Sequence, residues 1–178
     1  LATAVLAACG GGGGGGSVFI PPIDTPPAPP PPPPTGRGTL VEPSAQVARL
    51  SADQFKTLLR LDDKGRALEQ IAGTPKCGFE LQSIHYRTVG GREEEKTATG
   101  ALMVPSGTDP ACSGKRPVVM YAHGTTTDRG YDLSHWINPD QPAAAEGVIL
   151  AAMFAAQGYI VVAPNYAGYD KSTLSYHP

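Results

Sequence analysis

The 178-residue sequence has little net charge, because 14 Lys and Arg residues nearly balance 16 Asp and Glu residues, which gives −2. Proteins that bind nucleic acid usually carry a basic patch, so this composition gives no reason to expect a nucleic-acid partner. The His, Cys and acidic residues also lack the close spacing of a metal site. We therefore expect neither a nucleic-acid partner nor a bound metal.

The beginning of the chain lacks an apolar run long enough to span a membrane. Residues 1–9 are apolar and small, but a spanning helix needs about 20 such residues. The stretch is typical of the end of a secretory signal peptide, and Leu6-Ala7-Ala8-Cys9 resembles the lipobox of bacterial lipoproteins. We expect Cys9 to be diacylated, which would anchor the protein at the bacterial cell envelope. An ordinary signal peptide with a chance cysteine, and hence a secreted protein, is the alternative.

The next segment has no apolar pattern that could form a core. Residues 10–16 are all glycine, and residues 26–34 are proline interrupted once by alanine. Glycine runs form flexible coil, whereas proline runs form stiff polyproline II spacers. The sequence therefore predicts a disordered tether over residues 10–42 and a folded domain over residues 43–178. Because the chain begins at Leu1 and ends at Pro178 in what reads as a site loop, we expect a piece of a longer product.

Cysteine is scarce, and only Cys77 and Cys112 fall in the predicted domain. In an exported protein such a pair most simply forms a disulfide. In the chain-entropy model a bridge of this span contributes about 3–4 kcal/mol to stability. Two free thiols are the alternative.

The domain itself shows helix and strand signals in an α/β order. Ser51 and Gln54 form a capping box, which predicts a helix over residues 52–60. A second helix is expected over 64–72, followed by two strands, 81–89 and 97–104, that form a hairpin in which His85 is a surface residue. A strand over 116–122, a helix over 142–157 capped by Asp140, and a strand over 159–163 then predict a parallel βαβ unit.

The chemistry is expected where the apolar run 118–122 stops at His123-Gly124-Thr125-Thr126-Thr127. Such a continuous apolar run predicts a strand that is buried on both faces. Serine hydrolases of α/β architecture place a backbone N–H of the oxyanion hole in a turn of this kind. The matching nucleophile motif, G-x-S-x-G, is absent from all 178 residues. Ser134 beside His135 could suggest a dyad, but sequence neighbours rarely face one another productively.

Three segments carry a family resemblance: residues 99–105, residues 121–125, and residues 158–169. In this order and spacing, the chain from Cys77 onward resembles the amino-terminal half of the α/β-hydrolase superfamily, especially bacterial secreted lipases and esterases. The resemblance implies a mostly parallel sheet that begins with an antiparallel hairpin, carboxylic ester substrates and no cofactor. One departure is that the turn reads His-Gly-Thr-Thr instead of His-Gly-Gly-Gly.

The resemblance also assigns residue roles. The backbone N–H groups of Gly124, Thr125 and Thr126 are expected to form the oxyanion hole, with Thr125 favoured. His123 is expected to shape that turn rather than to act as the base, because the base comes late in this fold. The loop after the second parallel strand either lines the pocket or only shapes the site; its residues are Asn165, Tyr166, Tyr169 and Asp170.

The sequence thus predicts a piece of a lipid-anchored or secreted serine ester hydrolase, acting on small-molecule or lipid esters by a Ser-His-Asp acyl-enzyme mechanism. The serine, the acid and the histidine are expected beyond Pro178, and the chain alone is expected to be inactive and poorly soluble because one apolar sheet edge lacks its partner. The alternatives are a non-catalytic, surface-anchored binding or scaffold protein, and a peptidase of the prolyl-oligopeptidase type.

Overall fold

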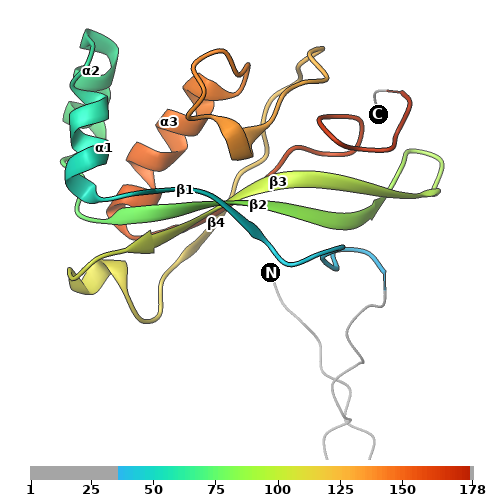
Figure 1. Ribbon diagram of the computed structural model, residues 1–178, viewed down its shortest axis with the longest axis horizontal. Helices are drawn as coiled ribbons and strands as arrows, with labels where there is room; N and C mark the ends of the chain where they lie inside the picture. Colours follow the sequence, from blue (N-terminus) through green and yellow to red (C-terminus); the bar gives the residue numbers. More distant parts are fainter. Residues whose placement is uncertain (1–35, 177–178) are drawn as a thin grey trace, which may run out of the picture. The chain divides into compact units, whose positions relative to one another are not determined.

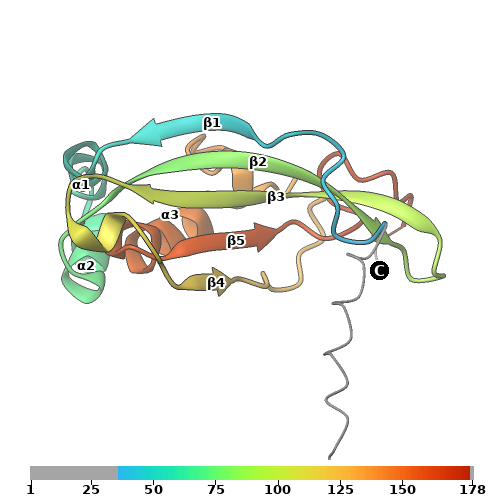
Figure 2. The ribbon, with the colours of Figure 1, turned by 90° about the horizontal axis from the view of Figure 1, so that it is seen from below.

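The sheet defines the fold and positions the site. The computed structural model describes residues 36–176, so the predicted signal segment 1–9 with Cys9, and the tether up to residue 35, lie outside the described residues. Five strands pair in the order β1-β2-β3-β5-β4 (Figure 2). They are β1 (Ala45–Leu50), β2 (Gly78–Val89), β3 (Glu95–Ser106), β4 (Val118–Met120) and β5 (Ile160–Pro164).

The strand directions agree with the expected hairpin and βαβ unit. β2 and β3 pair antiparallel along their whole length, from Gly78 opposite Ser106 to Val89 opposite Glu95. β5 pairs antiparallel with β3 and parallel with β4. The carboxyl ends of β4 and β5 therefore meet at one edge of the sheet, where α/β proteins bind ligands.

Three helices cover one face of the sheet: α1 (Ala52–Leu59), α2 (Asp63–Ala72) and α3 (Ala144–Met153) (Figure 1). The capping box is confirmed, since the Gln54 N–H donates to Ser51 Oγ and the Ser51 N–H donates to Gln54 Oε1. Asp62 caps α2 by accepting from the Gly65 N–H, which starts that helix one residue earlier than expected. Local side chains thus fix both helix starts.

The start of α3 corrects the expectation that Asp140 caps it. The residue before the helix is Ala143, which provides no side-chain cap. Asp140 instead lies in a preceding turn, where its N–H donates to Asn138 Oδ1 at 3.1 Å. The helix also ends at Met153, and the chain continues as a short 3-10 helix, η3 (Ala155–Gln157).

The first strand, β1, has no counterpart in the sequence prediction. Its six residues show no clear alternation and are mostly exposed, so no apolar face signals a strand. Antiparallel pairing with β2 makes it a strand. Residues before β1 also pair with β2, because the Gly38 N–H donates to the Arg87 carbonyl. Gly38 lies five positions before residue 43, where the sequence predicted the domain to begin.

The core lies between the sheet and the helices. Phe55 of α1, Phe79 of β2 and Trp136 are all 1 % exposed or less, and the two phenyl rings meet edge to face at 5.1 Å. Trp136 packs directly against Gly147 of α3, where a Cβ atom would lie 2.1 Å from Trp136 Cγ. The absence of a side chain at Gly147 is therefore what lets the indole ring approach the helix.

β4 differs from the predicted strand in both length and burial. It covers three residues instead of seven, and Val118 and Met120 are 63 % and 68 % exposed. The expectation of burial on both faces is wrong, because β4 lies at the sheet edge and its outward face is uncovered. Among residues 36–176, no strand pairs with the far edge of β4.

The expected disulfide is present. Cys77 precedes β2 and Cys112 ends the 3-10 helix η1 (Pro110–Cys112), and the two Cα atoms lie 5.4 Å apart. The bridge therefore joins the beginning of β2 to the segment that follows β3. A disulfide of this kind is typical of an oxidising, exported environment. No helix in residues 36–176 is long and apolar enough to cross a bilayer.

Candidate active site

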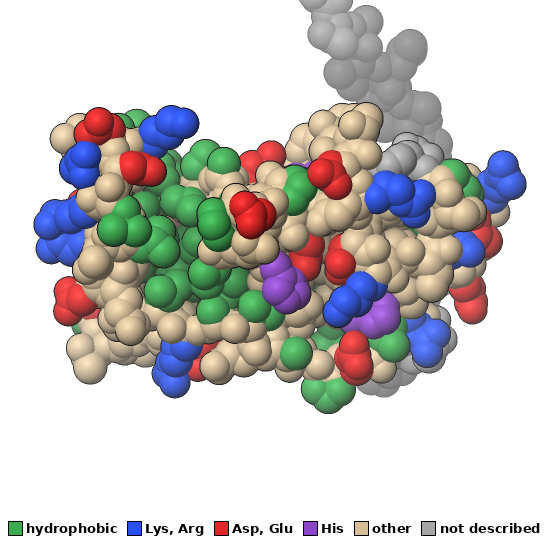
Figure 3. All heavy atoms as spheres, turned by 45° about the horizontal axis from the view of Figure 1, so that its top comes forward, with side chains coloured by type: hydrophobic (Ala, Val, Ile, Leu, Met, Phe, Trp, Pro, Cys, Tyr) green, Lys and Arg blue, Asp and Glu red, His purple; other side chains and the backbone are tan. Residues whose placement is uncertain are grey.

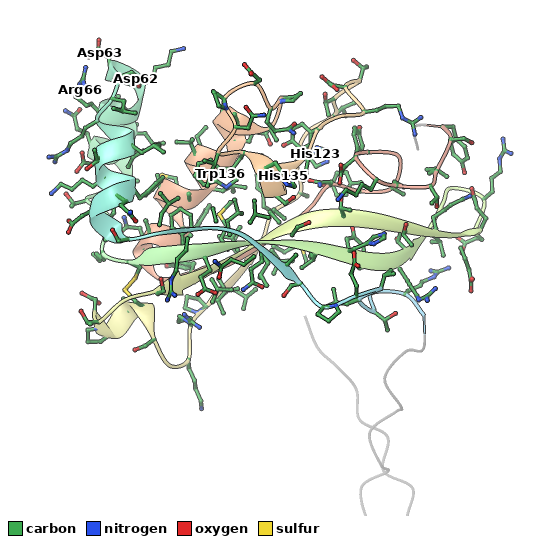
Figure 4. The ribbon with its side chains drawn as sticks, in the orientation of Figure 1. Asp62, Asp63, Arg66, His123, His135 and Trp136 are labelled. Atoms are coloured by element: carbon green, nitrogen blue, oxygen red, sulfur yellow. A yellow bond between two sulfur atoms is a disulfide. The ribbon has the colours of Figure 1, made fainter. Side chains whose placement is uncertain are left out.

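His123 is held in the turn that follows β4. Its side chain is buried between two tyrosine rings: Tyr131 lies at 4.4 Å and Tyr166 at 4.2 Å, both stacked. Tyr169 completes the cage with an edge contact at 5.2 Å. These rings come from the segments after β4 and β5, so the imidazole holds the two strand ends together. His123 is labelled in Figure 4.

Both ring nitrogens of His123 face carbonyl oxygens. Nδ1 lies 2.7 Å from the oxygen of Gly124, and Nε2 lies 3.2 Å from the oxygen of Asn165. A neutral imidazole has a single N–H, which donates to one of these two carbonyls, and the other nitrogen is covered by the second carbonyl oxygen instead of facing a position open to a nucleophile. This geometry supports the role of shaping the turn and gives no support to His123 as a base.

Two backbone carbonyl oxygens of the turn accept hydrogen bonds from tyrosine hydroxyls. Tyr166 Oη donates to the His123 carbonyl at 3.3 Å, and Tyr169 Oη donates to the Thr126 carbonyl at 2.7 Å. The N–H groups of Gly124, Thr125 and Thr126 donate to no other atom of residues 36–176. Gly124 and Thr125 are also exposed. The turn thus presents N–H groups without partners among residues 36–176, on a backbone whose carbonyls at His123 and Thr126 accept hydrogen bonds.

Tyr166 adopts a backbone conformation that is rare for a bulky residue. Its φ is +63°, in the left-handed region, and such strain persists only where the surroundings hold it. Stacking on His123 and the hydrogen bond to the His123 carbonyl provide that support. Burial raises the pKa of the Tyr166 hydroxyl, so the group remains a hydrogen-bond donor at neutral pH.

Asn165 connects the two loops that flank the turn. Its side chain is fully buried; Nδ2 donates to Asp132 Oδ1 at 2.8 Å and to Thr99 Oγ1 at 3.0 Å. Its Oδ1 accepts from the Leu133 N–H at 2.9 Å. Thr99 in turn donates to Asp170 Oδ2 at 2.7 Å. Asn165 and Asp170 therefore shape the site from within, while the ring of Tyr166 covers His123.

Asp132 and Thr99 were not expected from the sequence. Burial raises the pKa of the Asp132 carboxyl, but hydrogen bonds from Ser134, His135 and Asn165 outweigh it and hold the pKa below its usual range. Asp132 is therefore ionised at neutral pH although it is only 4 % exposed. An Asp followed two residues later by Ser, in a loop, was the only available signal, and it is common at turns.

Ser134 and His135 do contact one another, but not as a catalytic dyad. His135 Nδ1 lies 3.0 Å from Ser134 Oγ and 2.5 Å from Asp132 Oδ2. A triad uses opposite ring nitrogens for the serine and the carboxylate, whereas here both approach the same nitrogen. Ser134 also has no exposed surface. The pair fixes the 3-10 helix η2 (Leu133–His135) instead.

A second carboxylate, that of Glu146, holds the residues that precede and follow the turn 123–126. Glu146 of α3 accepts hydrogen bonds from the hydroxyls of Tyr121, at 2.8 Å, and Tyr131, at 2.6 Å. Burial, together with Glu146, raises the pKa of Tyr121 to about 12 and also raises that of Tyr131. Both hydroxyls therefore stay protonated and tie the turn to α3.

The fold is similar to that of solved hydrolase structures. Crystal structures of the rice cell wall degrading esterase LipA from Xanthomonas oryzae match with a TM-score of 0.61 and 29 % identity, over 80 % of this chain and 32 % of theirs. A protein from Legionella pneumophila whose name describes a hydrolase matches with a TM-score of 0.56 and 24 % identity, over 77 % of this chain and 33 % of its own. No protein-family model and no curated protein matches the sequence.

The chain has a hydrolase-like fold. The expected α/β class, with an antiparallel hairpin followed by a parallel βαβ unit, is confirmed by the strand pairing and by these neighbours. The chain spans about a third of the length of the solved structures it matches. The nucleophile motif G-x-S-x-G is absent from the 178 residues.

Proposed function

We propose that this chain is the amino-terminal part of an exported serine ester hydrolase and provides its oxyanion hole. The observation that carries the proposal is the turn 123–126, in which three carbonyls are held and the N–H groups of Gly124, Thr125 and Thr126 have no partner within residues 36–176. Preorganised N–H donors of this kind stabilise the negative charge of a tetrahedral intermediate.

The chemistry follows from that arrangement. A serine located beyond Pro178 attacks the ester carbonyl carbon while a histidine, also beyond Pro178, takes the serine proton. The carbonyl oxygen becomes an oxyanion and accepts hydrogen bonds from the turn. Collapse of the intermediate expels the alcohol, which receives the proton, and water then releases the acid from the acyl-enzyme.

Ester rather than peptide cleavage is supported by the esterase neighbour, which covers 80 % of this chain. The experiment compares the complete gene product with the 178-residue chain, using a fluorophosphonate probe that labels activated serines and p-nitrophenyl esters as substrates. We expect labelling and turnover by the complete product and neither by the 178-residue chain.

Two results would redirect the proposal. A complete product that is not labelled and does not turn over esters would be a binding or scaffold protein on a hydrolase fold. A labelled product that cleaves prolyl peptides in preference to esters would be a peptidase. Turnover by the purified 178-residue chain would contradict the placement of the nucleophile beyond Pro178.

We also propose that the protein is anchored at the cell envelope through Cys9. The disulfide between Cys77 and Cys112 supports export, because such bonds persist in oxidising compartments. Labelled palmitate should enter the wild-type protein and not a Cys9→Ser variant. No incorporation into either protein would leave an ordinary signal peptide as the explanation, and equal incorporation into both would place the acyl chain on another residue.

A further inference from the structure

Each N–H group of the turn after β4 points away from the carbonyl of the residue before it. A trans peptide unit is planar, with its C=O and N–H groups opposed, and residues 36–176 contain no cis peptide bond. A hydrogen bond to one carbonyl therefore also fixes the direction of the next residue's N–H. The Thr125 carbonyl accepts no hydrogen bond from the same range, so the Thr126 N–H has no direct support of this kind.

The far end of the turn is held by one side chain. Tyr169 Oη donates to the Thr126 carbonyl at 2.7 Å, which fixes the peptide unit between Thr126 and Thr127. In the described part of the chain, no other hydrogen bond joins residues 125–128 to anything outside the segment 123–131. The position of this end of the turn therefore depends on the Tyr169 hydroxyl.

Tyr169 is itself held in place by an unusual backbone. The φ angles of Gly168 and Asp170 are +96° and +46°, so the tyrosine lies between two residues in the left-handed region. Asp170 has a side chain, so its conformation costs energy and persists only where the surroundings hold it. Its N–H donates to the Arg129 carbonyl at 2.7 Å, and its Oδ2 accepts from Thr99 Oγ1 at 2.7 Å. These bonds fix the backbone from which the Tyr169 ring reaches the turn.

The opposite side of the turn is open. Gly124 and Thr125 are exposed, and their N–H groups donate to no atom of residues 36–176. Figure 3 shows much backbone and uncharged polar surface, in tan, at the end of the molecule where the segments after β4 and β5 lie, whereas apolar side chains gather toward α1 and α2. The turn is thus supported through its carbonyls, which leaves its N–H groups for a ligand.

We propose that Tyr169 is a positioning residue of the oxyanion hole. Its hydroxyl fixes the peptide unit 126–127, and the unit 125–126, which accepts no hydrogen bond of its own, takes its position from the units on either side. Without the hydroxyl, the Thr126 N–H is free to move away from the developing oxyanion. Tyr169 acts through the backbone and does not itself touch the reacting atoms. This inference rests on the proposed function, because the turn needs aimed donors only if it stabilises an oxyanion.

The test is Tyr169→Phe in the complete gene product, which keeps the ring and removes only the hydroxyl. Active serines are counted by complete labelling with a fluorophosphonate probe, so molecules that fail to fold do not enter the comparison. We expect kcat per active serine for a p-nitrophenyl ester to fall at least about tenfold, with KM changed less than about twofold. Phenylboronic acid, which forms a tetrahedral anionic adduct with an active serine, should bind more weakly by the same factor as kcat falls.

Tyr176→Phe is the matched control. The Tyr176 hydroxyl also donates at 2.7 Å, but to Glu94 instead of to the turn, so this variant should keep the wild-type kcat. An equal loss in both variants would overturn the inference, because any tyrosine hydroxyl would then have the same effect.

Other outcomes would also contradict the role of Tyr169. A lower melting temperature of Tyr169→Phe with unchanged kcat per active serine would make the residue purely structural. A raised KM with unchanged kcat would place it in substrate binding. A wild-type product without labelling or turnover would overturn the proposed function and this inference together, whereas an active wild type with an equally active Tyr169→Phe variant would overturn this inference alone.

Discussion

The imidazole Nε2 of His123 lies 3.2 Å from the carbonyl oxygen of Asn165, and this contact joins the residues that follow β4 and β5. Because the two strands are parallel and adjacent, their carboxyl ends are neighbours, although 42 residues separate the two positions. The Asn165 side chain extends the connection to the loop 132–135. The geometry of the turn therefore depends on a residue that is outside it.

Removing the Asn165 side chain should destabilise the fold. Asn165→Ala leaves the Leu133 N–H without its buried acceptor and removes one of the three hydrogen bonds to Asp132 Oδ1, which should cost about 2–4 kcal/mol in the free energy of unfolding. Urea denaturation measures the loss. Gln70→Ala, at an exposed position of α2, should change stability by less than about 0.5 kcal/mol. Equal losses for the two variants would contradict the role of Asn165.

Asp132 should make stability sensitive to acid. Its pKa in the folded state is held below its usual range, so its stabilisation is fully present above the unfolded-state pKa and is lost as pH falls through the folded-state pKa. Asp132→Asn should cost about 1–3 kcal/mol at pH 7 and much less at a pH below the folded-state pKa of Asp132. Thermal melts of both proteins across this range provide the measurement. A cost that is the same at both pH values would contradict it.

Gly147 should not tolerate a side chain. A Cβ atom there would lie 2.1 Å from Trp136 Cγ, inside a packed core that can relax only by moving the indole ring. Gly147→Ala should therefore destabilise the protein by about 1–3 kcal/mol, despite the higher helix propensity of alanine. Gly91→Ala is a suitable control, because its nearest contact would be 3.6 Å from Tyr176 Oη. A Gly147→Ala variant as stable as wild type would show that Trp136 is loosely packed.

The disulfide should contribute substantially to stability. Replacing Cys77 and Cys112 together by serine opens the loop that the bridge closes, and should lower the free energy of unfolding by about 3–4 kcal/mol. Adding a reductant to the wild-type protein should reproduce the effect. Identical urea midpoints for oxidised and reduced protein would contradict this expectation.

The sequence predicted those parts of the fold that local patterns encode. The capping box at Ser51 and Gln54, the hairpin and the βαβ unit all have signals within a few residues of one another. β1 has no apolar alternation and becomes a strand only because β2 offers an edge. The expected burial of β4 was wrong because burial depends on which strands and helices lie next to it, and no local pattern contains that information.

Part of the site was also predicted, where local patterns in the sequence locate its residues. His123 and the residues from Asn165 to Asp170 could be placed together, because each follows the end of a parallel strand. Asp132 and Thr99 could not, since they reach Asn165 from a long loop and from β3 through buried hydrogen bonds. Contacts between side chains that are distant in sequence leave no periodic signal.

The most direct test of the proposed oxyanion hole removes one backbone N–H donor by substitution. A second substitution at the same residue, which changes the side chain but keeps the N–H, is the control. Thr125→Pro eliminates the N–H of residue 125, whereas Thr125→Ala retains it. In the complete gene product, Thr125→Pro should lower kcat for a p-nitrophenyl ester by about 10²- to 10³-fold with little change in KM, and Thr125→Ala should remain within a few-fold of wild type. Similar kcat values for Thr125→Pro and Thr125→Ala would contradict the account.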